Sequence, residues 1–392
     1  MYLKMHVVVA LLSVSILVRT TYSVVLHATL PLSSEGSDIR AGLQSAFSFA
    51  NTNYFNTKRS MNLDIFDDAK NATQTIDYVR TIISQMPIFA DIFAIGTVYH
   101  LLPDIENGKM LIFGPEENSD VYYKENYTHL IHTKAPLSYE LEALIDYAIN
   151  ERHQLSFAIF YESNTLGIQG KRLVESILNR HAKNRPELPI RIVANASCPA
   201  RVLAIDAASS AIVKKYPDAV ICIGGRHAVY HFILESVSKG LLSTAFYGTS
   251  YVLPIQKPLY VGRGINLVTT ALRPDFYNKK IPLVDSFYRD MQQFSASITP
   301  SIIAFDAYVH GRIIAEVLRR IDGEVTIQAI IDQAARMDKP YSLEGLTIAF
   351  DPKKRTFNKD VWIAPGYKQR YLRVRQATKS KYAHDQQEGV SI

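Results

Sequence analysis

The sequence of 392 residues contains only two cysteines, Cys198 and Cys222. This number is too small for a fold held together by disulfides, so a hydrophobic core must stabilise the chain, and a hydrophobic content of 47% is sufficient to form one. Neither cysteine lies near the N-terminus, where a lipid-modified cysteine would stand. Whether the two pair with each other stays open, because the sequence does not fix the geometry of a disulfide. The length favours two domains over one.

Long hydrophobic runs are also scarce. The run at the N-terminus, Val7 to Val18, follows Lys4 and precedes small or polar residues that end at Ser23, which is the layout of a signal peptide. It is shorter than the roughly 20 residues that span a bilayer, so we expect residues 1–23 to be cleaved rather than kept as a membrane anchor. The remaining chain is expected to lack a membrane span and to be periplasmic or secreted.

The formal net charge is +6, and much of it comes from the C-terminal segment. Such a cluster can mark a contact with nucleic acid, but no nucleic-acid-binding motif accompanies it. We therefore interpret residues 367–392 as a basic flexible tail and expect no nucleic-acid partner. The basic residues of the tail are Lys368, Arg370, Arg373, Arg375, Lys379 and Lys381. Three glycosylation sequons, which would matter only in a eukaryotic secretory pathway, begin at Asn71, Asn126 and Asn195.

The sequence lacks the motifs of common enzymes and metal sites. There is no G-x-S-x-G elbow, and no serine or cysteine nucleophile can be placed with a histidine partner. Asp67 and Asp68 are adjacent at the end of a predicted strand, so their side chains point to different sides. His129 and His132 have no third ligand at a metal-binding spacing. No catalytic residue, metal or cofactor is therefore expected.

Glycines follow two predicted strands, in SNTLGIQG (residues 163–170) and CIGGRHA (residues 222–228). A glycine-rich turn between a strand and a helix can bind phosphate. Neither stretch has the full dinucleotide-binding or P-loop pattern. We interpret both as tight strand-to-helix turns at the carboxyl edge of a sheet.

Short hydrophobic segments alternate with segments of helical periodicity along most of the sequence. The alternation starts again after residues 110–115. Two consecutive arrays of this kind indicate an α/β protein with two lobes, each a parallel sheet covered by helices on both faces. The expected strands are residues 24–30, 61–66 and 91–96 in the first array, and 156–161, 189–194, 218–225 and 244–248 in the second.

The last third of the sequence departs from this alternation. Residues 302–321 have the pattern of one long helix, and residues 346–365 read as a hairpin around the turn 351–359. Segments near the C-terminus therefore complete both lobes, so the chain is expected to cross between the lobes several times. These crossings would form a hinge.

Five stretches of the sequence, in this order, resemble the landmarks of type I periplasmic solute-binding proteins. The most similar subgroup is that of the leucine/isoleucine/valine-binding proteins of ABC importers. The resemblance implies two Rossmann-like, doubly wound lobes that are joined by three crossings and close on a ligand by hinge motion. It places residues 24–136 and 267–340 in the first lobe, and residues 137–266 and 341–366 in the second. The five stretches are residues 24–51, 63–83, 157–178, 219–241 and 302–321.

The resemblance also implies where the ligand binds. In that family the first lobe holds the ligand carboxylate with hydroxyl and backbone N–H groups, and loops of the second lobe face the ligand. The matching first-lobe residues are Ser33, Ser34, Thr97, Tyr99, His100, Glu117, Asn118 and Ser119, and the matching second-lobe residues are Leu166, Thr249 and Tyr251.

Two positions depart from the pattern of the family's amino-acid binders. Leu166 stands where an aromatic residue is common, and Thr249 to Tyr251 replace a loop that often carries an acidic residue for the ligand ammonium. Burying an ammonium group without a counter-charge costs on the order of several kcal/mol. The negative charge that pairs with the ammonium would then have to come from Glu116 or Glu117 of the other lobe. The ligand is thus left open among amino acids, amides and related small polar compounds.

From these observations we expect a non-enzymatic solute-binding protein outside the cytoplasm. Its partners would be a small-molecule ligand and the permease of an ABC transporter. The alternative is a receptor-like sensory module that binds a ligand and signals through a partner protein.

Overall fold

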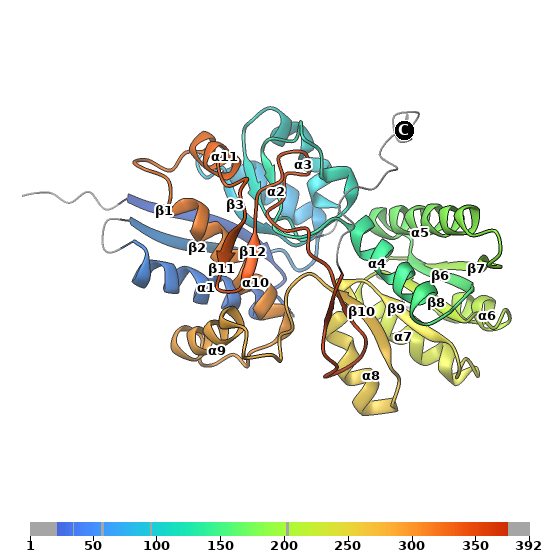
Figure 1. Ribbon diagram of the computed structural model, residues 1–392. Helices are drawn as coiled ribbons and strands as arrows, with labels where there is room; N and C mark the ends of the chain where they lie inside the picture. Colours follow the sequence, from blue (N-terminus) through green and yellow to red (C-terminus); the bar gives the residue numbers. More distant parts are fainter. Residues whose placement is uncertain (1–21, 34, 56–58, 95, 201–203, 375–392) are drawn as a thin grey trace, which may run out of the picture.

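The computed structural model describes residues 22–33, 35–55, 59–94, 96–200 and 204–374. Two lobes lie side by side, one built mainly from the first third of the chain and the other from its middle (Figure 1). The predicted signal peptide lies outside the described residues, except for Tyr22 and Ser23, which begin the first strand.

The first lobe contains a parallel sheet of five strands in the order β2-β1-β3-β4-β5. Its strands are β1 (Tyr22–Leu30), β2 (Arg59–Asp67), β3 (Ile88–Ile92), β4 (Leu111–Phe113) and β5 (Leu130–Ile131). The helices around it are α1 (Gly36–Asn53), α2 (Ala72–Ile82), α3 (Thr97–Glu106), α9 (Pro282–Phe294), α10 (Ile302–Leu318) and α11 (Ile327–Ala335). The predicted strands 24–30 and 61–66 are confirmed, whereas β3 begins three residues before the predicted 91–96 and ends at Ile92, so Phe93 and Ala94 belong to a loop.

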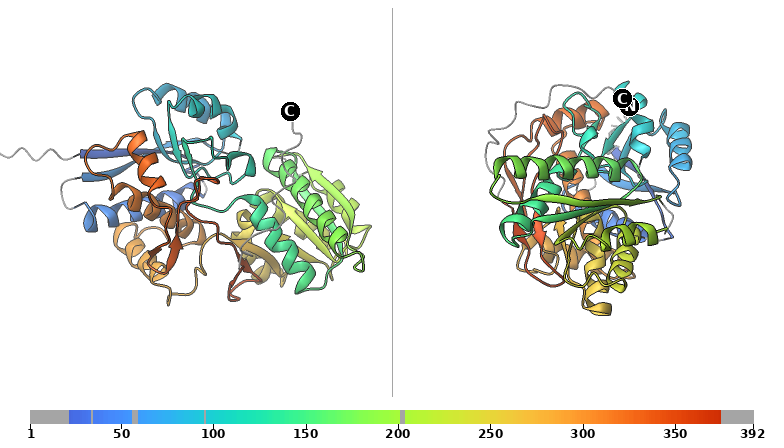
Figure 2. Two further views of the ribbon diagram at one scale, coloured as in Figure 1. Left: turned by 45° about the horizontal axis from the view of Figure 1, so that its top comes forward. Right: turned by 90° about the vertical axis from the view of Figure 1, so that its right-hand side faces the viewer.

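The second lobe contains a sheet in the order β14-β13-β10-β9-β8-β6-β7, with helices on both faces (Figure 2). Its strands are β6 (Ser156–Glu162), β7 (Arg191–Cys198), β8 (Ala219–Ile223), β9 (Ala245–Gly248), β10 (Leu267–Ala271), β13 (Trp362–Ala364) and β14 (Leu372–Arg373). Its helices are α4 (Leu137–Asn150), α5 (Thr165–Asn184), α6 (Asp206–Val213), α7 (Arg226–Ser238) and α8 (Gln256–Arg263). The strands β6 to β10 are parallel, and β13 and β14 are antiparallel to their neighbours.

The glycine turns have the expected structural role. Asn164 caps α5 by accepting a hydrogen bond from the Gly167 N–H at 2.8 Å. A Cβ atom at Gly167 would lie 2.0 Å from the Glu162 carbonyl oxygen, so the strand and the helix approach too closely for a side chain there. Cys198 and Cys222 are buried and do not form a disulfide.

The structure corrects two of the expected lobe boundaries. Residues 267–271 were expected in the first lobe, but they form β10, which pairs with β9 in the second-lobe sheet. Residues 341–348 were expected in the second lobe, but their buried side chains pack in the hydrophobic core of the first lobe with α9 and α10. Both segments are short and hydrophobic, and such a pattern does not indicate which of two cores will bury it.

The expected hairpin around residues 351–359 is also corrected. Strand β12 (Leu346–Ile348) pairs with β11 (Tyr341–Leu343) across a two-residue turn, and β13 pairs with β10 instead. The turn residues Glu344 and Gly345 have positive φ angles of 47° and 94°, as the tight turn of a two-residue hairpin requires.

The start of the predicted flexible tail is ordered. Leu372 and Arg373 form β14 on the edge of the second-lobe sheet, and Tyr371 is buried. Arg373 also forms an ion pair with Asp360 at 2.7 Å. Residues from 375 onward lie outside the described part of the chain.

The first lobe depends on the close packing of α1 against α10. A Cβ atom at Gly42 of α1 would lie 2.2 Å from the Ala304 carbonyl oxygen, and one at Gly311 of α10 would lie 2.7 Å from the Ala46 Cβ. Glycine at these positions allows the two helix backbones to approach closely, because interaxial distance depends on the side chains at the contact.

Replacing Gly42 with valine is therefore expected to lower the free energy of unfolding by about 3 kcal/mol, since the helices must separate. Gly262 in α8 is the matched control, because a Cβ atom there meets nothing within 4 Å, and Gly262→Ala should change stability by no more than about 1 kcal/mol. Urea unfolding followed by circular dichroism measures both variants. Equal stability of the two would contradict this packing.

Candidate functional site

A cleft of about 590 Å³ lies between the lobes, at the carboxyl ends of strands from both sheets. Open α/β sheets bind ligands at this edge, because the loops after parallel strands gather there. The first-lobe residues of its wall are Glu35, Lys70, Phe93, Ala94 and Glu116. The second-lobe residues of its wall are Glu162, Asn164, Ala200, Gly225, Arg226, His227, Ala228 and Tyr251.

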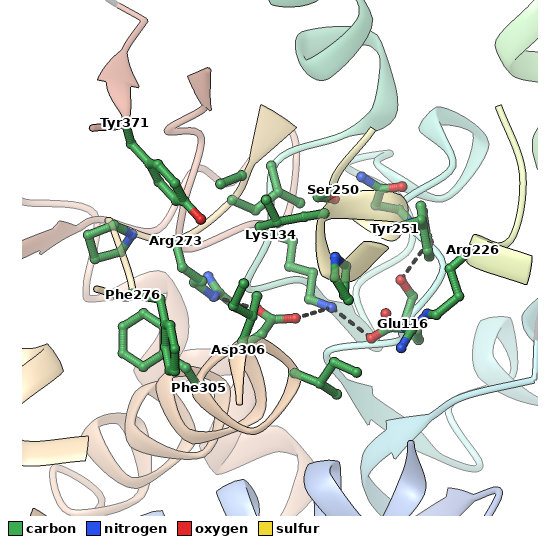
Figure 3. Close-up of a pocket in the computed structure, with 18 residues that line it drawn as sticks. Glu116, Lys134, Arg226, Ser250, Tyr251, Arg273, Phe276, Phe305, Asp306 and Tyr371 are labelled. Atoms are coloured by element: carbon green, nitrogen blue, oxygen red, sulfur yellow. Dashed lines mark hydrogen bonds and ion pairs between the residues drawn. The ribbon is translucent and has the colours of Figure 1, made fainter. Parts of the chain in front are cut away.

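Beside the cleft, charged groups join the segments that connect the lobes (Figure 3). The Lys134 ammonium lies 2.7 Å from Glu116 Oε2 and 2.7 Å from Asp306 Oδ2. Arg273, just after β10, contacts the other oxygen of Asp306 at 2.7 Å. Burial alone would raise the pKa of Asp306, but the charges of Lys134 and Arg273 outweigh it and hold that pKa well below its usual range. The network thus fixes two crossing segments to α10.

A histidine extends this network into the first lobe. His310 Nε2 lies 2.5 Å from the Ala90 carbonyl oxygen, and its Nδ1 lies 2.8 Å from the Thr133 hydroxyl. Because a carbonyl only accepts, Nε2 carries the proton and Nδ1 accepts from Thr133. Burial lowers the pKa of His310 to about 4, so the ring is neutral at pH 7.

Tyr251 makes a direct hydrogen-bonded link between the lobes. Its hydroxyl donates to the Glu116 carbonyl oxygen at 2.8 Å and accepts from the Asn118 N–H at 3.2 Å. The buried Glu140 carboxylate, on α4, accepts from the Asn118 side chain and from the Ser250 N–H, each at 2.7 Å. The loop after β9 is thereby fixed against the loop after β4.

Among the predicted site residues, the structure brings Tyr251 to the cleft and Asn118 to an adjoining cavity at the hinge. Ser119 donates a hydrogen bond to Gln169 of the other lobe. Glu117 is buried and accepts from the Gly96 N–H at 2.9 Å, so it supports the loop before α3. Thr97 and Thr249 are buried as well.

Other predicted site residues do not face the cleft. Leu166 is only 1% exposed and belongs to the core of the second lobe, because α5 begins at Thr165 and its first turn directs this side chain inward. Ser33 is exposed on the loop before α1, and Tyr99 and His100 are exposed on α3. Ser34 lies outside the described residues.

Sequence reasoning missed four charged residues of the cleft wall: Glu35, Lys70, Glu162 and Arg226. Glu162 ends β6, Glu35 and Lys70 lie in loops between a strand and the following helix, and Arg226 is the first residue of α7. That position was the available signal, because loops at the carboxyl ends of parallel strands converge.

Most of these charges already have partners. Lys70 pairs with Glu35 at 3.1 Å, and Glu162 accepts a hydrogen bond from the Gly225 N–H. Burial alone would raise the pKa of Glu35, but the charge of Arg226 in the other lobe and the contact with Lys70 outweigh it and lower that pKa. The positive charge of Arg226 therefore lowers the pKa of Glu35 from across the cleft.

Comparisons with known proteins support an assignment of this architecture. The family described as "Periplasmic binding protein" matches residues 24–368. This chain belongs to the periplasmic binding protein family. Its two-lobed α/β architecture is the type I fold, as the sequence predicted. The family consists of non-enzymatic solute-binding proteins and implies an extracytoplasmic location.

Solved structures agree with this fold. A possible leucine/isoleucine/valine-binding protein from Rhodopirellula baltica superposes with a TM-score of 0.78 at 17% identity, covering 91% of this chain and 97% of the other. A substrate-binding periplasmic protein from Ralstonia solanacearum superposes with a TM-score of 0.77 at 18% identity, and the match covers 90% of this chain and 100% of the other. A branched chain amino acid ABC transporter protein from Thermus thermophilus superposes with a TM-score of 0.74 at 16% identity, and the match covers 92% of this chain and 97% of the other.

A comparison with curated protein sequences finds no match. None of the helices among the described residues combines the length and the hydrophobicity that crossing a membrane requires.

Replacing Lys134 with methionine is expected to lower the free energy of unfolding by about 3–5 kcal/mol, because Glu116 and Asp306 lose their shared cation. Lys109→Met is the matched control. Lys109 pairs with Asp104 at 3.0 Å but is 58% exposed, so its loss should cost less than about 1 kcal/mol. Chemical denaturation measures both, and similar losses would contradict the role of Lys134.

The neutral His310 predicts a pH dependence. Its pKa is about 4 in the folded chain and about 6.5 when unfolded, so the unfolded chain binds more protons between these values. His310 therefore makes stability fall as the pH drops from about 6.5 to about 4. His310→Gln should show a flatter pH profile of the melting temperature, whereas exposed His231→Gln should keep the wild-type profile. Parallel profiles for all three proteins would disprove this role.

Proposed function

We propose that this chain is a solute-binding protein that closes its two lobes on a small polar ligand, such as an amino acid, an amide or a related compound, and delivers it to the permease of an ABC transporter. In this proposal residues 1–23 are a signal peptide, and the mature protein is periplasmic or secreted. The single observation that carries the proposal is the cleft, whose wall combines residues from both lobes next to the hinge.

The size and lining of the cleft suit a small ligand. A volume of about 590 Å³ lies within the roughly 300–1,000 Å³ that is usual for small-molecule sites. Phe93 and Ala94 give its wall an apolar part, and Tyr251 and Asn164 give it polar groups. Proteins of this fold are described with bound valine and with 4-hydroxybenzoate, which are ligands of this size class.

Function in uptake requires that the ligand favour the closed form. A ligand shifts the equilibrium between open and closed lobes only as far as its affinities for the two forms differ. Groups on both walls, such as Lys70 on the first lobe and Arg226 on the second, supply this difference, because a ligand contacts both only when the lobes close.

A screen of the protein against amino acids, their amides, urea derivatives and aromatic acids tests the proposal. One ligand class at about 100 times its Kd should raise the free energy of unfolding by about 2.7 kcal/mol. Small-angle X-ray scattering should then show a smaller radius of gyration with that ligand, and no compound should be consumed. Failure of every compound to stabilise the protein would count against the proposal.

A further inference from the structure

Two neighbouring helices of the second lobe bring a histidine and two acidic residues together. Glu142 and Asp146 lie one turn apart on α4, so their side chains share one face of that helix. His181 lies in the last turn of α5, which packs against α4 through the shared core of the lobe. One nitrogen or oxygen atom from each residue lies within 4.8 Å of the other two. Within the described part of the chain, this is the only group of three such residues close enough to hold a metal ion.

The imidazole of His181 is the buried member of this group. The residue is only 9% exposed, yet its Nε2 atom forms no hydrogen bond with any described residue. This nitrogen lies 3.0 Å from Asp146 Oδ1, but the contact does not have the geometry of a hydrogen bond. A buried polar atom without a hydrogen bond has lost its hydration without compensation. A metal ion between Nε2 and the carboxylates would supply the missing partner, because histidine ligates metals through a ring nitrogen.

The carboxylates of this group remain accessible to an ion. Glu142 accepts hydrogen bonds from Arg180 through both of its oxygens. The side chains of this pair are 42% exposed for Arg180 and 40% exposed for Glu142, and ion pairs so exposed to water are weak. A divalent cation can therefore displace Arg180 from Glu142. The negative charges of Glu142 and Asp146 then balance the two positive charges of the ion.

The types of ligand indicate which cation fits. Imidazole nitrogen suits transition metals such as Zn²⁺, whereas Ca²⁺ and Mg²⁺ prefer sites made of oxygen ligands. Zn²⁺ binds histidine and carboxylate at about 2.0–2.2 Å, so the ligand atoms of one ion lie roughly 3–4 Å apart. Small rotations of the Glu142 and Asp146 side chains are enough to reach this spacing. Three protein ligands leave one position of a tetrahedral ion for water.

We propose that Glu142, Asp146 and His181 bind one Zn²⁺ ion, which links α4 to α5 on the surface of the second lobe. These residues are not part of the cleft wall, so this inference does not depend on the proposed function. The sequence led us to expect no metal, because the ligands come from two helices and their spacing matches no known metal-binding motif. An ion that binds only the folded chain also stabilises it.

Titration of the tag-free full chain with Zn²⁺, after removal of metals with EDTA, tests this site. Isothermal titration calorimetry should show one bound Zn²⁺ per chain, and Zn²⁺ should raise the melting temperature, whereas Ca²⁺ and Mg²⁺ should not. His181→Gln and Asp146→Asn should each weaken Zn²⁺ binding at least about tenfold, since even groups behind the ligands of a metal change its affinity this much. Arg180→Gln should bind Zn²⁺ more tightly than the wild type, because it leaves Glu142 free.

The matched control is His231→Gln, which replaces an exposed histidine of the same lobe outside this group and should bind Zn²⁺ like the wild type. The melting temperature of each variant without metal checks folding. Asp146→Asn, at a partly exposed position, serves as the second variant if replacement of the buried His181 unfolds the lobe. Absence of Zn²⁺ binding, or unchanged affinity in both His181→Gln and Asp146→Asn, would overturn this proposal.

Discussion

The ammonium group of Lys134 lies between two carboxylates, Glu116 and Asp306, in the first segment that connects the lobes. Arg273 from the next connecting segment binds the remaining oxygen of Asp306. A buried charge without a partner costs several kcal/mol, so these four groups stabilise the junction between the lobes. The connecting segments are consequently held against α10, next to the cleft.

The placement of the cleft follows from strand direction. Parallel strands end at a common edge, and here the loops after β1 to β4 face the loops after β6 to β9. The charges on these loops are mostly paired within one lobe, as Glu35 is with Lys70. This pairing limits the charge that a ligand meets, and on the second-lobe wall it leaves the basic Arg226 together with the acidic Glu162.

Much of the fold could be predicted from the sequence, because hydrophobic periodicity is a local property of the chain. The alternation of strands and helices between residues 24 and 248 indicated two doubly wound lobes, and the structure confirms this. The assignment of short hydrophobic segments to a lobe was less successful. Residues 267–271 and 341–348 were each expected in the wrong lobe, because their burial depends on a partner surface far away in the sequence.

The sequence by itself determined the fold class, through the period of its hydrophobic residues, and the turns at Gly167 and Gly225, through the space that glycine leaves. Only the tertiary structure decided which residues form the cleft wall. Leu166 was expected there and lies in the core, whereas Glu162 and Arg226 were not expected and line the wall. The reason is physical: the direction of a side chain at the junction of a strand and the following helix depends on where that helix begins and on which lobe faces it, and neither is encoded in local periodicity.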